Sequence, residues 1–137
     1  MATLTKFNCF VEDLAEKKHN LGSDTLTIAL CAAANAPTAS NTVLANLTQI
    51  SYTNLSSRAV TTTSSAQTSG TYKLVLADLV LTASGSVGPF RYAVLYNDTA
   101  TNDELIGYVD YGSDITLANL ETLTIDFDGS AGAIVIS

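Results

Sequence analysis

Acidic side chains are the residues of this 137-residue sequence whose types and spacing come closest to a chemical site. Acid–base catalysis needs two carboxyl groups held in different environments. The acidic residues gather at three places, namely Asp98, Asp103 and Glu104; Asp110 and Asp114; and Asp126 and Asp128. All of them flank predicted turns, where a solvated Asp is the ordinary finding. The pattern therefore predicts no catalytic residue.

The sequence offers little for nucleophilic or metal chemistry. It has one histidine, His19, and two cysteines, Cys9 and Cys31, which form no CxxC pair, so a zinc site is not expected. Residues 126–129 resemble part of a calcium loop but lack its terminal Glu. We expect no metal, no cofactor and no enzymatic activity. The cysteines are expected to be buried free thiols, and His19 a structural residue at a helix end, where the dipole favours its charged form.

The charge balance limits the classes of partner. The net charge is −7, and the six Lys and Arg residues are scattered, so direct binding of nucleic acid is not expected. No apolar run reaches about 18 residues, which predicts no membrane span. The first ten residues lack the pattern of a signal peptide, which predicts a reducing cytosol and no disulfide. Only 14% of residues are charged, which also suits a surface covered by neighbouring proteins.

The elements that would position these residues are mostly strands. Alternating apolar residues predict a half-buried strand over 25–31 and a central strand, covered on both faces, over 90–96. Further strands are predicted at 59–63, 71–77, 104–111, 115–117, 122–127 and 133–137, with a turn at 112–114. Turn signals recur about every 8–12 residues. The whole chain therefore predicts one mainly β domain, with an antiparallel β-sandwich of about seven to eight strands, jelly-roll or immunoglobulin-like, over residues 23–137.

Residues 1–22 are predicted to form a short N-terminal helix or arm. Phe7, Phe10, Val11 and Leu14 make one apolar stripe within a predicted helix over 5–18, with Thr5 as its N-cap. So short a stripe must dock on a sheet or on a neighbouring chain. Both readings stay open at the level of the sequence.

Residues 51–70 are mostly Ser, Thr, Asn and Gln. A polar tract of this length is unusual in a compact domain unless something else orders it. It can be an exposed loop, an edge strand or an interaction arm. This tract, the 32–41 loop and the N-terminal helix are poorly explained by the domain's own core. The candidate partner-interface residues are Phe7, Phe10, Val11, Leu14, Pro37, Tyr52, Leu55 and Arg58.

Several stretches resemble a group of small structural proteins of tailed bacteriophages. They are GPFRYAVLYNDT at 88–99, LIGYVDYGSDITL at 105–117 and TLTIDFDGSAGAIVIS at 122–137. The segment at 19–50, HNLGSDTLTIALCAAANAPTASNTVLANLTQI, is also similar. The likeness is weakest at 51–70, where related sequences tend to have a Gly-rich NGYTAGG stretch and this one has NLSSRAVTTTSS.

The resemblance implies a non-enzymatic virion component, made in the host bacterial cytoplasm and assembled into the virion. The favoured role is a capsid decoration (cement) protein that binds the outer surface of the major capsid protein lattice as a homo-oligomer, a dimer or a trimer. The alternative is a tail or neck component that assembles through edge strands. A third class, a carbohydrate-binding β-sandwich, would use tyrosines as a stacking platform.

Overall fold

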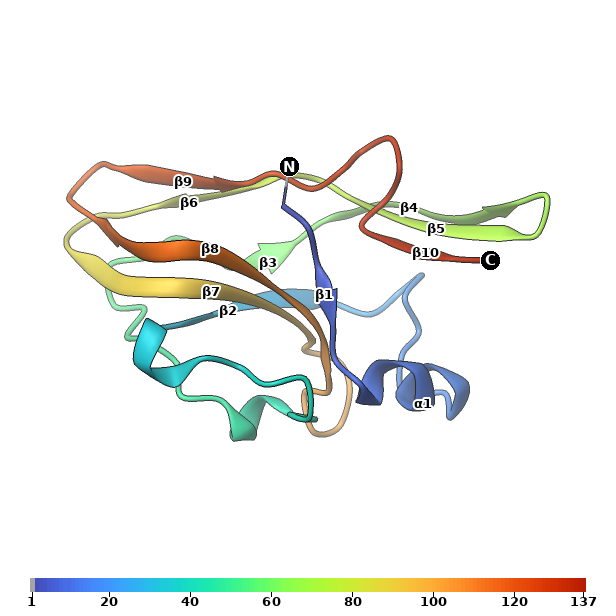
Figure 1. Ribbon diagram of the computed structural model, residues 1–137. Helices are drawn as coiled ribbons and strands as arrows, with labels where there is room; N and C mark the ends of the chain where they lie inside the picture. The colour runs from blue at the N-terminus through green and yellow to red at the C-terminus, as the bar shows by residue number, and fades with distance from the viewer. Residues whose placement is uncertain (1) are drawn as a thin grey trace.

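The computed structural model describes residues 2–137 and is mainly β, with open antiparallel sheets and one helix (Figure 1). The strands are β1 (Thr5–Lys6), β2 (Leu26–Cys31), β3 (Ala59–Val60), β4 (Thr62–Thr68), β5 (Thr71–Leu76), β6 (Leu79–Thr82), β7 (Val87–Asn97), β8 (Leu105–Leu117), β9 (Thr122–Ile125) and β10 (Ile134–Ile136). The helix is α1 (Cys9–Ala15), and two 3-10 turns, Ala33–Asn35 and Leu44–Asn46, follow β2.

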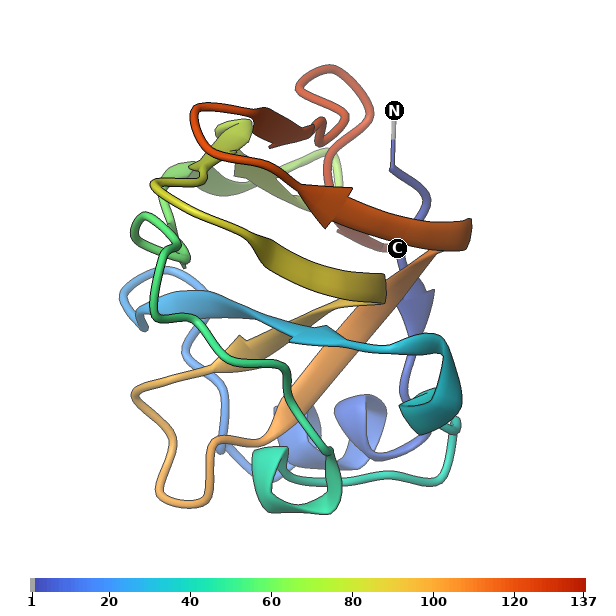
Figure 2. The ribbon, with the colours of Figure 1, turned by 90° about the vertical axis from the view of Figure 1, so that its left-hand side faces the viewer.

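The strands form three sheets. A five-stranded sheet has the order β1-β8-β7-β2-β3, a three-stranded sheet the order β10-β5-β4, and β6 pairs with β9. Every pairing is antiparallel. Figure 1 shows the two smaller sheets in a layer above β2 and β7. Figure 2, the view from the left-hand end, shows the space between these layers.

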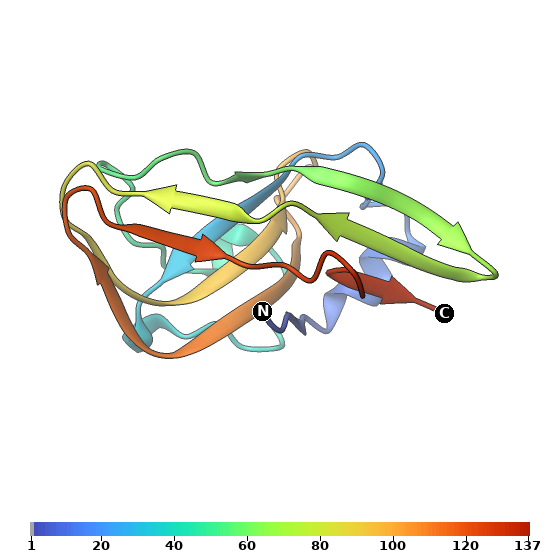
Figure 3. The same cartoon turned by 90° about the horizontal axis from the view of Figure 1, so that it is seen from above.

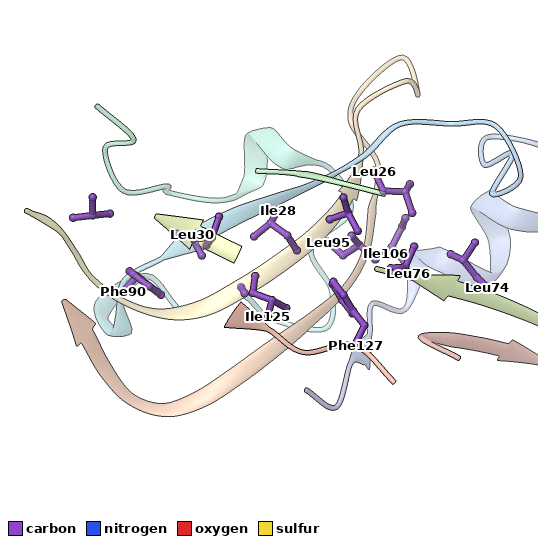
Figure 4. Close-up of a cluster of buried hydrophobic side chains, with 14 of the residues drawn as sticks. Leu26, Ile28, Leu30, Leu74, Leu76, Phe90, Leu95, Ile106, Ile125 and Phe127 are labelled. Carbon is purple, nitrogen blue, oxygen red and sulfur yellow. The ribbon is translucent and has the colours of Figure 1, made fainter. Parts of the chain in front are cut away.

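One apolar cluster joins all three sheets (Figure 4). Leu95 of β7, Leu74 of β5, Leu81 of β6 and Ile125 of β9 are all fully buried in it. The predicted mainly β class is therefore confirmed. The described residues form ten strands, several of only two to four residues, and a sandwich of seven to eight strands is not confirmed.

The opposite face of the five-stranded sheet is also covered. Ala29 of β2 and Val94 of β7 are fully buried there. Leu44 and Leu47 pack against this second cluster, because the backbone of Leu44 bonds to Asp103. All six residues of β2 are buried as a result, and the prediction of a half-buried strand is wrong.

The helix is shorter than its predicted range of 5–18. Thr5 and Lys6 pair with Tyr108 and Gly107 of β8, so Thr5 is a strand residue and not the N-cap. Asn8 occupies the N-cap position and makes no side-chain cap bond. The edge of β8 offers backbone hydrogen-bond partners to these residues, and such long-range pairing cannot be predicted from local helix propensity.

The long strand β8 corrects a second prediction, the turn at 112–114. Phe90 pairs with Ile115 and Tyr92 with Asp110, so the register shifts between these pairs. The extra residues form a β-bulge around Gly112, whose φ is +81°, and the strand continues to Leu117. Gly is suited to this bulge because it adopts positive φ without steric strain.

Candidate interaction surface

An apolar groove of about 520 Å³ runs between α1 and β10. Its lining residues come from four elements and the chain beside them: Leu4, Lys6, Phe10, Val11, Leu14, Ile106, Ala133, Ile134, Val135, Ile136 and Ser137. Apolar clefts with few polar groups are the usual form of binding sites. The groove exposes apolar side chains of both α1 and β10 and is the candidate interaction surface.

Two sheet edges border the groove. β1 is the last strand of the five-stranded sheet, and β10 is the last strand of the three-stranded sheet. Gly107 lets the N-terminal segment lie close to β8, since a Cβ at this position would stand 2.7 Å from Leu4 Cγ. Figure 3, from above, shows β10 at the margin of its sheet with α1 beneath it.

The walls of the groove expose apolar side chains to solvent. Val11 is 55% exposed, Val135 49% and Ile136 39%. Lys6 is exposed at the groove and has no ion-pair partner within residues 2–137. An apolar cleft with one unpaired cation suits a partner surface that combines an apolar anchor with a carboxylate.

The predicted interface residues separate into two places. Phe10, Val11 and Leu14 meet at the groove, but only Val11 is exposed. Phe7 is fully buried against Tyr108, with ring centroids 5.1 Å apart. Pro37 is buried as well.

Tyr52 and Arg58 lie elsewhere and hold the polar tract against β2. The Arg58 guanidinium stacks 3.7 Å from the Tyr52 ring centroid and donates to the Ile28 carbonyl. The Tyr52 hydroxyl accepts from the Leu30 backbone N–H at 2.8 Å, and burial raises its pKa. Leu55 forms an isolated bridge with Ala83. These three predicted residues are not brought to the groove.

A buried polar cluster lies beyond the end of α1. Asn97 Nδ2 donates to Asp24 Oδ2 at 2.7 Å and lies 3.0 Å from His19 Nδ1. Asn97 Oδ1 accepts from the backbone N–H groups of Thr99 and Ala100. These bonds fix the orientation of the amide, so His19 Nδ1 must be the acceptor. The imidazole is therefore neutral, with its proton on Nε2.

The neutral imidazole corrects the expectation of a charged His19. Only 5% of this residue is exposed, and burial lowers its pKa below the ordinary value, although Asp13, Glu104 and Asp24 oppose the shift. Desolvation outweighs both these carboxylates and the short helix's dipole. Asp13 is itself buried and pairs with Lys18 at 3.0 Å.

Other chemistry expected or considered from the sequence has these outcomes. Cys9 and Cys31 are free thiols, half-buried and buried, and burial raises the pKa of each to about 11. Tyr92 and Tyr96 are 9% and 4% exposed, so their rings offer no open stacking platform. Residues 2–137 contain no group of three or more His, Cys, Asp and Glu side chains that could hold a metal ion.

No helix formed by residues 2–137 is long and apolar enough to cross a membrane. Comparisons with protein-family models, with curated proteins and with solved structures found no match to this chain. Functional proposals therefore rest on the geometry of the molecule and on its sequence patterns.

The wall contributed by β10 was missed from the sequence, as was Lys6. Three consecutive apolar residues at 134–136 place apolar side chains on both faces of a strand, and Val135 and Ile136 of the edge strand β10 remain exposed. That pattern is the signal that could have pointed to an exposed face.

Proposed function

We propose that this protein is a non-enzymatic virion structural protein of a tailed bacteriophage, and that it decorates the capsid. Its partner is the outer surface of the major capsid protein lattice, where it stabilises the head. The observation that carries the proposal is the open apolar groove between α1 and β10. The phage-like stretches at 88–99, 105–117 and 122–137 supply the class of particle.

The physical properties of the chain support this role. Packed sheets joined by one core make a rigid clamp, and the fold proposed here is a jelly-roll or immunoglobulin-like sandwich. A net charge of −7 with few charged residues suits a surface that neighbours cover. Many copies that each bind weakly to a lattice gain by multivalency, particularly when they are joined as dimers or trimers.

The proposal is tested on purified particles. The chain should be found in head fractions at a copy number proportional to that of the capsid protein. Val11→Asp should release it from heads at lower temperature, because a charged side chain replaces the exposed apolar contact of α1. The matched control is Val80→Asp on β6, which changes a residue of similar exposure, 50% against 55%. Absence of the chain from purified particles would refute the virion role.

A tail or neck role is favoured by a different observation. Six of the seven residues of β4 are exposed, and this edge strand has no charge and no proline, the usual protections against pairing with another strand. Such an edge is suited to β-augmentation in a ring or tube. Segregation of the chain with tails instead of heads would select this role.

A further inference from the structure

A leucine stands exposed at the end of the molecule away from the groove. Leu120 lies in the turn between β8 and β9 and is 78% exposed, the highest value among the large apolar residues described. Its neighbour Glu121 is exposed too. Figure 1 shows this turn at the far left, whereas α1 and β10 lie at the right.

The backbone at Leu120 is unfavourable for this residue type. Its φ is +71°, in the left-handed region that Gly and Asn adopt readily and that a bulky residue rarely occupies. Three backbone bonds hold the turn. Leu120 N donates to the Ala83 carbonyl at 2.8 Å, Ala83 N donates to the Glu121 carbonyl at 3.0 Å, and Glu121 N donates to the Ala118 carbonyl at 3.0 Å. An isolated chain gains little from a leucine that is both strained and exposed.

The groove at the other end has matching chemistry. It is apolar, it exposes Val11, and it contains the unpaired cation Lys6. The turn presents an apolar side chain beside a carboxylate, and the groove presents an apolar recess beside an ammonium group. Two copies, each with a net charge of −7, repel each other in general. A contact that pairs opposite charges offsets this repulsion locally.

We propose that the Leu120 turn of one copy inserts into the α1–β10 groove of the next, with Glu121 paired to Lys6. The contact joins two different surfaces, so it is heterologous. Repeated around a three-fold axis it closes a trimer, and without closure it grows a filament. This contact uses the groove that the proposed function gives to the capsid, so the two partners compete for it, and self-association is tested on the isolated protein without capsid.

The first test is sedimentation of the purified chain at concentrations up to about 1 mM. The wild type should associate, and Leu120→Asn should weaken association at least tenfold without lowering the melting temperature, because Asn tolerates positive φ. Val80→Asn is the matched control for loss of an exposed apolar residue and should associate like the wild type. A wild type that stays monomeric throughout, or a Leu120→Asn variant that associates normally, would overturn the proposal.

The second test distinguishes head-to-tail contact from symmetric pairing. Leu120→Asn retains an intact groove, and Val11→Asp retains an intact turn. Each variant alone should be monomeric, and an equal mixture should form a two-chain complex that grows no further. A mixture that remains monomeric would contradict the proposal. Lys6→Glu and Glu121→Lys should each weaken association, and the double variant should restore it. Failure of the double variant to associate would show that Glu121 and Lys6 do not pair in the contact.

Discussion

The β7–β8 and β4–β5 ribbons are both antiparallel hairpins, but the protein uses them for opposite purposes. Phe90, Val94 and Leu95 of β7 have no exposed surface, whereas β4 is exposed along nearly its whole length. The backbone hydrogen bonding is of the same kind in both. The difference lies in the side chains. Backbone hydrogen bonds give both hairpins their shape, whereas the burial of apolar side chains determines how much each hairpin stabilises the fold.

The same comparison separates stability from contact with partners. β7 and β8 lie at the centre of the five-stranded sheet and connect both apolar clusters. The three-stranded sheet places β4 on one open edge and β10 on the other. Both edges of this sheet expose residues, although the groove beside β10 is also lined by the core residues Phe10 and Ile106.

The largest loss of stability is expected from a cavity opened in β7. Phe90→Ala should lower the free energy of unfolding by about 3–5 kcal/mol, since the ring is fully buried and the neighbours relax only in part. Denaturant unfolding measures the change. Ser64→Ala in exposed β4 is the control and should change stability by less than about 0.5 kcal/mol. Equal losses from the two variants would show that β4 is as structural as β7.

A smaller effect is expected at the edge of β8. Gly107→Ala should lower the free energy of unfolding by about 1–3 kcal/mol, because the new Cβ meets Leu4 and, at 3.0 Å, the Thr5 carbonyl. Thermal unfolding and protease sensitivity of the N-terminal segment report the change. Gly129→Ala, with nothing within 4 Å of the added Cβ, should be near neutral. An unchanged melting temperature for Gly107→Ala would mean that β1 is dispensable.

The free energy of unfolding should also depend on pH through His19, which contacts Asn97 at the end of β7. Its pKa is lower in the folded chain than the ordinary 6.5, so the unfolded chain binds the proton more readily. This contribution to stability is complete above pH 6.5 and decreases as the pH falls below it, by at most about 1.4 kcal/mol per pH unit. His19→Gln should flatten this part of the stability profile, measured by denaturant unfolding. A profile of the same slope in the variant would assign the dependence to other groups.

The smallest effect is expected where β7–β8 itself reaches solvent. Arg91 and Asp110 form a two-bond ion pair, with distances of 2.7 and 3.0 Å, and this pairing raises the pKa of Arg91 and lowers that of Asp110. Exposed pairs are screened and contribute little. Asp110→Asn should leave the melting temperature within experimental error at physiological salt. A clear loss would mean that the exposed part of the ribbon stabilises the fold as well.

Much of the strand pattern was predictable because local alternation coincides with burial. The predicted strands near β2, β5, β7, β9 and β10 are all present. The degree of burial was less predictable. The face of β2 that carries Thr27 and Ala29 is covered by Leu44 and Leu47, because the segment after β2 folds back over the sheet.

The polar tract and the groove were harder to predict for a related reason. Residues 62–68 have little apolar content, and they form β4 because β5 supplies a backbone ladder, with one register shift between Thr62 and Ser64. Val11 was singled out as an interface candidate and is exposed at the groove, but the other exposed apolar residues there, Val135 and Ile136, lie more than 120 positions away. Leu120 has no sequence signal at all, since an exposed strained leucine is unusual on every local rule.

The N-terminal segment imposes an order on biosynthesis. Ala2 bonds to the Asp126 carbonyl, and Lys6 pairs with Gly107, so these residues find their neighbours only after about a hundred further residues have been made. At a translation rate of about 5–20 residues per second, that delay is on the order of 10 s. Until then β1 lacks its partner strand β8, α1 lacks the sheet on which it packs, and β2 lacks its partner strand β7. The fold therefore cannot assemble progressively as the chain emerges, and it is completed only once residues up to Asp126 have been made.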